Sequence, residues 1–207
     1  MQLVVISNPE VIPNEAGIIN QLFEAGLTRF HLRKPGYSAQ QVAALIRQID
    51  EQYHYLIALH QHHAVAPYFG IERLHYTEQH RANTHAGKLT LQNRQGYVLS
   101  TSLHDVEALQ TLVWFDNAFI GPVFNSISKP GYNAKWPEDF CLDKQNIDLN
   151  IIALGGIEPT NLNKIKAMNF DGAAVLGTIW NDPDTAVANF KCLQQQVQII
   201  TENHEDR

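Results

Sequence analysis

The residues best suited to chemistry in this sequence are cations, imidazoles, hydroxyls and glycines that follow short apolar runs of the chain. They are His31, Arg33, Lys34, His60, Gln61, His80, Ser102, Ser126, Ser128, Lys129, Gly155, Gly156, Gly177 and Thr178. Groups of these types hold anions, because their N–H and O–H groups donate hydrogen bonds and the cations neutralise charge. The set therefore indicates phosphate or pyrophosphate binding, and we identify no nucleophile or catalytic triad in it.

Two glycine-containing turns are the first candidates for an anion site. Gly155-Gly156 precedes a helical stretch that begins near Pro159, and Gly177-Thr178 precedes another near Pro183. Backbone N–H groups that are exposed in such turns form a phosphate cradle. The alternative is that both are ordinary turns, since glycine is frequent wherever a chain reverses direction.

A second anion site is predicted where cations and hydroxyls follow neighbouring strands. The cations are Arg33, Lys34 and Lys129, and the hydroxyls belong to Ser102, Ser126 and Ser128. Together these groups can neutralise a pyrophosphate. The alternative is that Arg33 and Lys34 are solvated surface charges, which is the usual position of such residues.

Histidine is unusually frequent, with ten residues in the chain. His60, His62 and His63 lie near the end of the third apolar run, and His75 and His80 lie near the fourth. Imidazole is a common ligand of Zn²⁺ and similar ions, so a transition-metal site is one interpretation. The spacing matches no zinc signature, however, and the alternative is that these are polar loop and pocket residues.

Eight short apolar runs rich in Val and Ile recur along the chain. They cover Leu3–Ser7, Arg29–Arg33, Tyr55–His60, Arg73–Thr77, Tyr97–Ser102, Ala118–Phe124, Ile151–Gly155 and Gly172–Leu176. Runs that are this short and continuously apolar are typical of strands buried on both faces, as in parallel sheets.

The segments between these runs mostly have helical periodicity. Helices are predicted over Ala16–Ala25, from a cap at Ser38 to Ile49, after Pro159, and after Asp182-Pro183. Residues 78–96 have only a weak helical pattern. Residues 130–144 are a candidate active-site loop. Strands that alternate with helices predict an α/β fold, and eight units predict a compact, single-domain (β/α)8 TIM barrel over residues 1–207. An open doubly wound sheet with one or two false strands is the alternative.

Composition excludes several classes of protein. The chain is 44% hydrophobic and 17% charged, which argues against global disorder, and its formal net charge of −6 argues against a general nucleic-acid binder. No apolar run reaches the roughly 18 residues of a membrane helix, and the N-terminus lacks the pattern of a signal peptide. We therefore expect a cytoplasmic protein with no nucleic-acid or membrane partner. The two cysteines, Cys141 and Cys192, form no CxxC pair and are expected to be buried and reduced.

Several motifs resemble one known family, that of thiamine-phosphate synthases and thiazole tautomerases, from Leu3 to about Phe190. The most specific is the stretch from Gly121 to Lys129, Gly-Pro-Val-Phe-Asn-Ser-Ile-Ser-Lys. Ala153–Ile157, Asp171–Leu176, Ser102-Leu103-His104 and Phe30–Lys34 are also similar to the family's motifs. The resemblance implies a compact (β/α)8 barrel and a role in thiamine biosynthesis.

The resemblance implies a transferase that joins hydroxymethylpyrimidine pyrophosphate to a thiazole phosphate with release of pyrophosphate. Arg33 and Lys129 are the implied catalytic residues, which hold the pyrophosphate with help from Ser102. The implied substrate contacts are Ser126 and Ser128 beside the thiazole, Gly155, Gly156, Gly177 and Thr178 at the thiazole phosphate, and His31, Lys34 and His60 at positions near the family's Gln, Lys and Asn.

The resemblance also implies a Mg²⁺ cofactor, with Gln61 and His80 at the positions of the family's metal-linked aspartates. Pro122 stands where the tautomerase branch has a catalytic histidine, as in the synthases. The alternatives are a thiazole-phosphate tautomerase-like enzyme and a homologue that binds a phosphorylated ligand without turnover. The expected partners are small phosphorylated substrates, and a homo-oligomer is left open.

Overall fold

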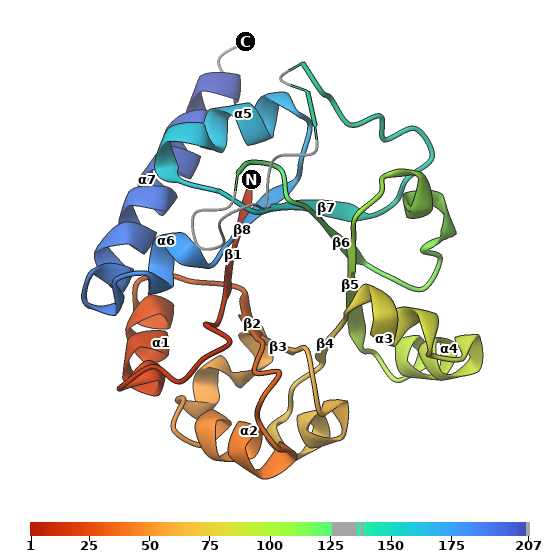
Figure 1. Ribbon diagram of the computed structural model, residues 1–207, viewed down its shortest axis with the longest axis vertical. Helices are drawn as coiled ribbons and strands as arrows, with labels where there is room; N and C mark the ends of the chain where they lie inside the picture. Colours follow the sequence, from red (N-terminus) through yellow and green to blue (C-terminus); the bar gives the residue numbers. More distant parts are fainter. Residues whose placement is uncertain (126–135, 138, 206–207) are drawn as a thin grey trace.

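The chain folds into a closed barrel of eight parallel strands, in which every strand pairs with the next and β8 pairs with β1 (Figure 1). The computed structural model describes residues 1–125, 136–137 and 139–205. The strands are β1 (Gln2–Ile6), β2 (Phe30–Leu32), β3 (Ile57–Leu59), β4 (Arg73–Tyr76), β5 (Val98–Leu103), β6 (Asn117–Ile120), β7 (Asn150–Leu154) and β8 (Gly172–Val175). All eight predicted strands are present, so the TIM barrel is confirmed and the open sheet is excluded.

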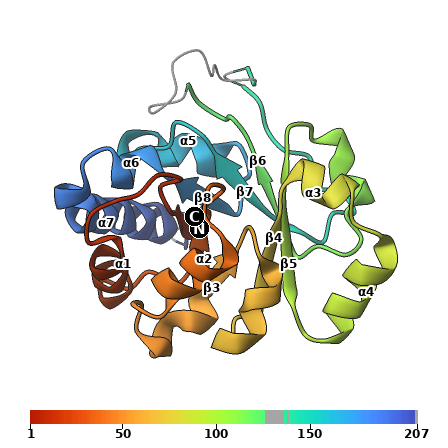
Figure 2. The same ribbon diagram turned by 60° about the horizontal axis from the view of Figure 1, so that its bottom comes forward.

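Helices surround the barrel and cover its outer face (Figures 1 and 2). They are α1 (Glu15–Glu24), α2 (Ala39–Ile46), α3 (Glu78–Ala82), α4 (Ala86–Arg94), α5 (Leu162–Ala167), α6 (Gly177–Trp180) and α7 (Ala186–Glu205). Short 3-10 turns complete the connections at Glu51–Leu56, His63–Phe69, Glu107–Thr111, Pro159–Asn161 and Pro183–Thr185. Within the described ranges, no helix has the length and apolar character that crossing a membrane requires.

Local sequence explains why α2 forms where it does. The Ser38 side chain accepts a hydrogen bond from the Gln41 backbone N–H, and the Gln41 side chain accepts one from the Ser38 N–H, so the first turn has a reciprocal capping box. Val42, Leu45 and Ile46 then bury one face against the barrel. The predicted cap at Ser38 is confirmed.

Two features of the fold differ from the sequence-based expectations. The segment after β4 forms α3 and α4, although its apolar residues are too few for a helical stripe; the caps at Thr77 and His85 start these helices instead. Cys141 and Cys192 are exposed free thiols rather than buried ones.

The interior of the barrel has two unlike halves. An apolar group from β1, β6, β7 and β8 fills one half: Val4, Ile6, Phe119, Ile152 and Ala174. The other half holds three buried histidines, His31 on β2, His60 directly after β3 and His75 on β4, of which His31 and His75 contact Phe119. The larger apolar core lies outside the barrel, between the strands and the helices. The barrel interior is therefore partly polar, and this polar part lies beneath the mouth where the strands end.

The ring of strands closes between the two ends of the chain. Residues Gln2 to Val5 pair in register with Gly172 to Val175. Outside the ladder, the Trp180 side chain donates from Nε1 to the backbone oxygen of Ile6 at 2.7 Å, and both residues are buried. This hydrogen bond connects α6 to the end of β1. It therefore fixes the position of the segment after β8 relative to the segment after β1 at the mouth of the barrel.

Candidate active site

A cavity of about 560 Å³ opens at the C-terminal mouth of the barrel. Six of the predicted site residues line it: Arg33, Ser102, Gly155, Gly156, Gly177 and Thr178. They follow or end four different strands, which is the arrangement by which barrel enzymes gather functional groups at one face. The volume is within the range of small-molecule sites, roughly 300–1,000 Å³.

Arg33 supplies a cation to this cavity from the end of β2. Its backbone is held by Ser7, whose hydroxyl donates to the Arg33 carbonyl at 3.0 Å and accepts from the Arg33 N–H at 2.8 Å. Ser7 is fully buried after β1. Among the residues the structure describes, no carboxylate pairs with the Arg33 guanidinium, so this charge is available to an anion.

The two glycine turns lie at the same mouth, after β7 and β8. In the described part of the chain, the backbone N–H groups of Gly156, Gly177 and Thr178 have no acceptor within the protein. The Thr178 hydroxyl donates to the Ile157 carbonyl, which ties the two turns together. Asn161 further braces the first turn by donating to the Gly156 carbonyl at 2.8 Å. The result is a rigid set of backbone donors of the kind that binds phosphate.

Gly156 is needed for close packing as well as for its N–H group. Its φ is +64°, in the left-handed region that glycine adopts without steric cost. A Cβ at this position would overlap the Asn125 carbonyl and Phe124 in the loop after β6. The turn after β7 therefore packs directly against the loop that follows β6.

The floor of the cavity is apolar. Phe119, Leu154 and Leu176 line it, and they belong to or adjoin the apolar half of the barrel interior. Such a surface can accommodate flat heteroaromatic rings while the polar groups at the rim hold charged substituents.

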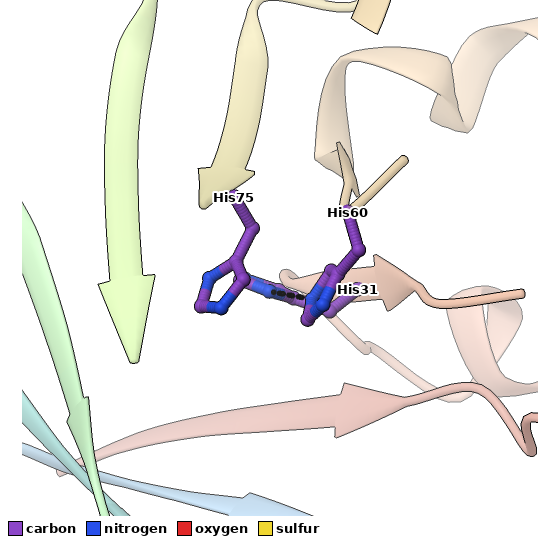
Figure 3. Close-up of side chains that lie close together, drawn as sticks. All are labelled: His31, His60 and His75. Atoms are coloured by element: carbon purple, nitrogen blue, oxygen red, sulfur yellow. Dashed lines mark hydrogen bonds between the residues drawn. The ribbon is translucent and has the colours of Figure 1, made fainter. Parts of the chain in front are cut away.

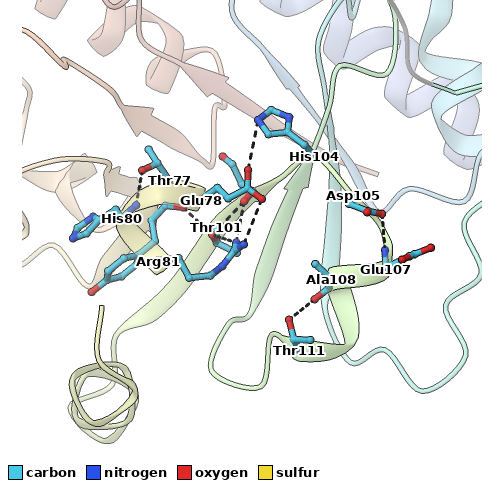
Figure 4. Close-up of polar contacts among 12 residues, drawn as sticks. Thr77, Glu78, His80, Arg81, Thr101, His104, Asp105, Glu107, Ala108 and Thr111 are labelled. Atoms are coloured by element: carbon cyan, nitrogen blue, oxygen red, sulfur yellow. Dashed lines mark hydrogen bonds and ion pairs between the residues drawn. The ribbon is translucent and has the colours of Figure 1, made fainter. Parts of the chain in front are cut away.

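A polar wall on the β4–β5 side completes the cavity (Figure 4). Arg81 on α3 donates from Nη1 to the Thr101 hydroxyl at 2.7 Å and to the Ser102 carbonyl at 3.0 Å. Glu78 lies 3.8 Å from Arg81 and 3.9 Å from the His104 imidazole. Arg81 therefore fixes the backbone that presents Ser102, and α3 is part of the site although the sequence analysis does not predict that helix.

His31 and His60 are not among the residues that line the cavity, and their side chains lie together with that of His75 (Figure 3). Each is 5% exposed, and His31 Nδ1 lies 3.0 Å from His60 Nε2. The His60 ring stacks on that of His75 with centroids 3.9 Å apart. Desolvation lowers the pKa of His31 to about 3, and desolvation followed by neighbouring charges lowers the pKa of His60 and of His75 well below 6.5. All three imidazoles are therefore neutral at pH 7.

The placement of Lys34 disagrees with its predicted contact with substrate. Its side chain is fully buried, and Nζ lies 2.6 Å from a carboxylate oxygen of Glu15 on α1. Nζ also donates to the Glu10 carbonyl at 2.7 Å. Lys34 therefore anchors α1 to the end of β2, because a charge that is buried this completely needs a partner.

Gln61 and His80 do not form the predicted Mg²⁺ site. Gln61 Oε1 accepts the Lys34 backbone N–H at 3.0 Å, whereas the His80 ring packs against Tyr76 with centroids 4.6 Å apart. Mg²⁺ prefers oxygen ligands, above all carboxylates, and these two residues offer one engaged amide oxygen and an imidazole. The residues therefore do not fit the ion.

Three predicted site residues, Ser126, Ser128 and Lys129, lie outside the described residues. They follow Asn125, where the described part of the loop after β6 ends. Their predicted contacts with pyrophosphate and thiazole stay predictions.

Several residues of the site escaped the sequence analysis. Ser7 ends the first apolar run as a polar residue, a signal that could have identified it. Arg81 carried no such signal, because its role depends on a helix that the apolar pattern does not predict. His75 did not escape, because the sequence analysis names it as a possible metal ligand or pocket residue; its place mid-strand between apolar neighbours puts it inside the barrel by the alternation of strand side chains.

Comparison with known proteins gives a consistent result. Residues 3–179 match the family model described as thiamine monophosphate synthase. Thiamine-phosphate synthase of Leuconostoc citreum is 26% identical over 185 residues, which cover 81% of this chain and 82% of that protein. The counterpart in Lysinibacillus sphaericus is 26% identical over 190 residues, covering 86% and 87%.

Solved structures agree with the architecture. Thiamine phosphate pyrophosphorylase from Bacteroides thetaiotaomicron superposes with a TM-score of 0.72 at 26% identity, covering 96% of this chain and 98% of its own. The Pyrococcus furiosus thiamine phosphate pyrophosphorylase has a TM-score of 0.76 at 18% identity, covering 96% of each chain, which shows the shared fold alone.

Proposed function

We propose, from the premise that this chain belongs to the thiamine monophosphate synthase family, that it joins hydroxymethylpyrimidine pyrophosphate to a thiazole phosphate. The family and its transferase class, predicted from sequence motifs, are confirmed. One observation carries the proposal: among the described residues, a single cavity has a guanidinium without a carboxylate partner after one strand and backbone N–H groups without acceptors after two others. Two anion-binding subsites at one mouth suit a reaction between two phosphorylated substrates.

The reaction needs positioning and charge stabilisation more than acid–base chemistry. The thiazole ring nitrogen attacks the methylene carbon of the pyrimidine, the new C–N bond forms, and the C–O bond to pyrophosphate breaks. The pyrophosphate leaves with the electron pair of that bond, so negative charge grows on it in the transition state. Cations that contact this leaving group are therefore the main source of catalysis in the proposal.

Arg33 is proposed to contact the pyrophosphate. It is half-buried, its backbone is fixed by Ser7, and its guanidinium has no carboxylate partner among the described residues. A guanidinium binds two phosphate oxygens at once, which a lysine cannot do with the same geometry. Lys129, which the family motif implies as a contact to pyrophosphate, is proposed as the second cation.

The thiazole phosphate is proposed to bind at the two glycine turns. The N–H groups of Gly156, Gly177 and Thr178 lack acceptors in the part of the chain that the structure describes, and the hydrogen bonds from Thr178 and Asn161 hold the two turns in place before any ligand arrives. Because the Thr178 hydroxyl is already donating, we assign phosphate binding to the backbone of Thr178 and not to its side chain. The apolar floor at Phe119 would then carry the ring.

The test compares single-turnover rates of wild type, Arg33→Ala and Lys129→Ala with both substrates present. Loss of one cation from a charge-stabilising site costs about 10²–10³ in rate, whereas an exposed substitution changes stability by no more than about 0.5 kcal/mol. Arg94→Ala is the matched control, because Arg94 is exposed on α4 and away from the cavity.

Each outcome distinguishes the candidate functions. A large rate loss in Arg33→Ala with an unchanged unfolding midpoint supports the transferase proposal. Wild-type rates in that variant would overturn the assignment of Arg33. Turnover of the thiazole phosphate without a pyrimidine partner would instead identify a tautomerase-like enzyme, and tight binding of both substrates without any turnover would identify a binding protein.

A further inference from the structure

We infer that His31, His60 and His75 form a binding site for a transition-metal ion of the Zn²⁺ class inside the barrel. His31 lies on β2 and His75 on β4, and His60 directly follows β3, the strand between them (Figure 3). One ligand nitrogen from each lies within 4.8 Å of the others, and each residue is at most 5% exposed. This inference does not depend on the proposed function.

The protonation states of the cluster suit a metal. Burial keeps all three imidazoles neutral, so each has a nitrogen lone pair at pH 7. His31 Nδ1 and His60 Nε2 lie 3.0 Å apart and share one proton between them. Two nitrogens that bind one tetrahedral Zn²⁺ at 2.0–2.1 Å are about 3.3 Å apart. The separation of the two nitrogens therefore needs to change little when an ion replaces that proton.

Among the residues described, His60 makes only one of the two hydrogen bonds that its ring nitrogens allow, through Nε2 to His31. Its Nδ1 is buried and has no hydrogen-bond partner in the described part of the protein. Buried polar atoms without partners are uncommon in native proteins. Whichever His60 nitrogen bears the proton, the ring is incompletely satisfied in the metal-free protein.

His75 is already held in the tautomer that a ligand needs. The Ser100 hydroxyl donates to the Leu74 carbonyl at 3.4 Å, so it accepts the hydrogen bond from His75 Nδ1 at 2.9 Å. His75 Nε2 is then unprotonated, and it accepts from the Ser102 hydroxyl at 2.9 Å. Metal-binding histidines commonly have their second nitrogen fixed by such a hydrogen bond, here supplied by Ser100.

The ligand set determines the class of ion. The cluster consists of three imidazoles and contains no carboxylate. Imidazole suits Zn²⁺, Co²⁺, Ni²⁺ and Cu²⁺, whereas Mg²⁺ requires oxygen ligands. The site is thus distinct in chemistry from the Mg²⁺ position that family resemblance places at Gln61 and His80.

Binding requires one local rearrangement. The rings of His60 and His75 are stacked with an interplanar angle of 20°, and two parallel rings cannot both direct in-plane lone pairs at one ion. The His75 ring must therefore turn out of the stack and give up the hydrogen bond from Ser102. Under the proposed function, that release frees the Ser102 hydroxyl to donate to an anion in the cavity.

The experiment measures metal binding without substrates. Metal-stripped wild type is titrated with Zn²⁺ in competition with a chromophoric chelator, and with Co²⁺ by visible absorption. We expect one ion per chain, a Co²⁺ spectrum of low coordination number, and a higher unfolding temperature with Zn²⁺ because the ion binds only the folded state. His31→Gln and His60→Asn should each weaken Zn²⁺ binding at least tenfold.

Controls locate the ion. His85→Asn removes an exposed histidine while keeping a side chain that can cap α4, and it should bind Zn²⁺ like wild type. His63→Gln tests the neighbouring pair of His63 and His80, whose rings lie 5.1 Å apart, and it should also have no effect. X-ray absorption of the wild-type Zn²⁺ complex should show three imidazole ligands, which tests the site even if a variant does not fold.

Three results would overturn the inference. They are absence of a one-to-one Zn²⁺ or Co²⁺ complex in wild type, undiminished binding in folded His31→Gln or His60→Asn, and loss of binding in His63→Gln instead.

Discussion

Replacing Lys34 with Met tests whether this cation holds the fold or the substrate. Lys34 and Glu15 are buried together, and their ion pair measures 2.6 Å from Nζ to Oε2. The second oxygen of Glu15 is buried without a hydrogen-bond partner among the described residues. The Lys34 ammonium is therefore the main group that stabilises the buried carboxylate charge. Lys34→Met leaves that carboxylate buried and unpaired.

The expected loss of stability is large. Removing one partner of a buried ion pair costs about 3–5 kcal/mol. For a chain of 207 residues, the entropy of unfolding is about 0.43 kcal/mol/K, so this loss lowers the unfolding temperature by about 7–12 °C. Lys166→Met is the matched control, because Lys166 is exposed on α5 and its replacement should change stability by no more than about 0.5 kcal/mol.

The pH dependence of this loss identifies its cause. Burial raises the pKa of the Glu15 carboxyl, and Lys34 acts in the opposite direction. In Lys34→Met only the raising effect remains, so the folded state binds the proton more readily than the unfolded state does. The deficit relative to wild type is then fully present at high pH and shrinks as pH falls from 8 to 5. Denaturant unfolding of both proteins across that range measures it.

A compensating variant and an activity assay complete the test. Lys34→Met combined with Glu15→Leu removes both charges and should recover most of the lost stability. Below its unfolding transition, Lys34→Met should keep kcat/KM within about twofold of wild type, because the side chain does not line the cavity. A pH-independent deficit, or a hundredfold loss of kcat/KM in folded protein, would refute the structural role.

Three further predictions follow from contacts at the mouth of the barrel. Ser7→Ala removes both hydrogen bonds to the Arg33 backbone and should cost about 1–3 kcal/mol in denaturant unfolding, with a lower kcat/KM because the guanidinium loses its fixed position; unchanged values in both assays would contradict this. Gly156→Ala should lower the free energy of unfolding by at least about 2 kcal/mol and weaken the binding of inorganic phosphate measured by calorimetry. The reason is that a φ of +64° disfavours a residue with a Cβ and that the loop after β6 occupies the space of this atom. Phosphate affinity equal to that of wild type would contradict the assignment of a phosphate site to this turn. Trp180→Phe should lower the free energy of unfolding, measured by thermal unfolding, by about 1–2 kcal/mol, because the Ile6 carbonyl loses its hydrogen-bond donor. Unchanged stability would show that water replaces the bond.

The strand pattern was predictable because parallel barrel strands are buried on both faces. Each strand therefore appears as a short apolar run, and eight such runs allow few other closed arrangements. The positions of Arg33 and of the glycine turns followed from the same reasoning, since they come directly after predicted strands.

The other site residues depend on information that the local sequence does not contain. Lys34 adjoins Arg33, yet its side chain faces a helix and not the cavity, and only the partner carboxylate on α1 explains that direction. The clustering of His31, His60 and His75 depends on the register between three strands, which apolar runs do not determine. Helix α3 depends on a cap at Thr77 and on tertiary contacts, because its five residues include none that is buried.

The pairing of β1 with β8 has a consequence for synthesis of the protein on the ribosome. The first strand is translated long before its second neighbour, since Gln2 pairs with Gly172. At about 5–20 residues per second, the intervening chain takes roughly ten to thirty seconds to emerge. Throughout that interval β1 keeps one open edge, and open edges recruit foreign strands. The open edge of β1 must therefore be protected until β8 is made, and a product truncated before β8 keeps that edge of β1 unpaired although β1 still pairs with β2.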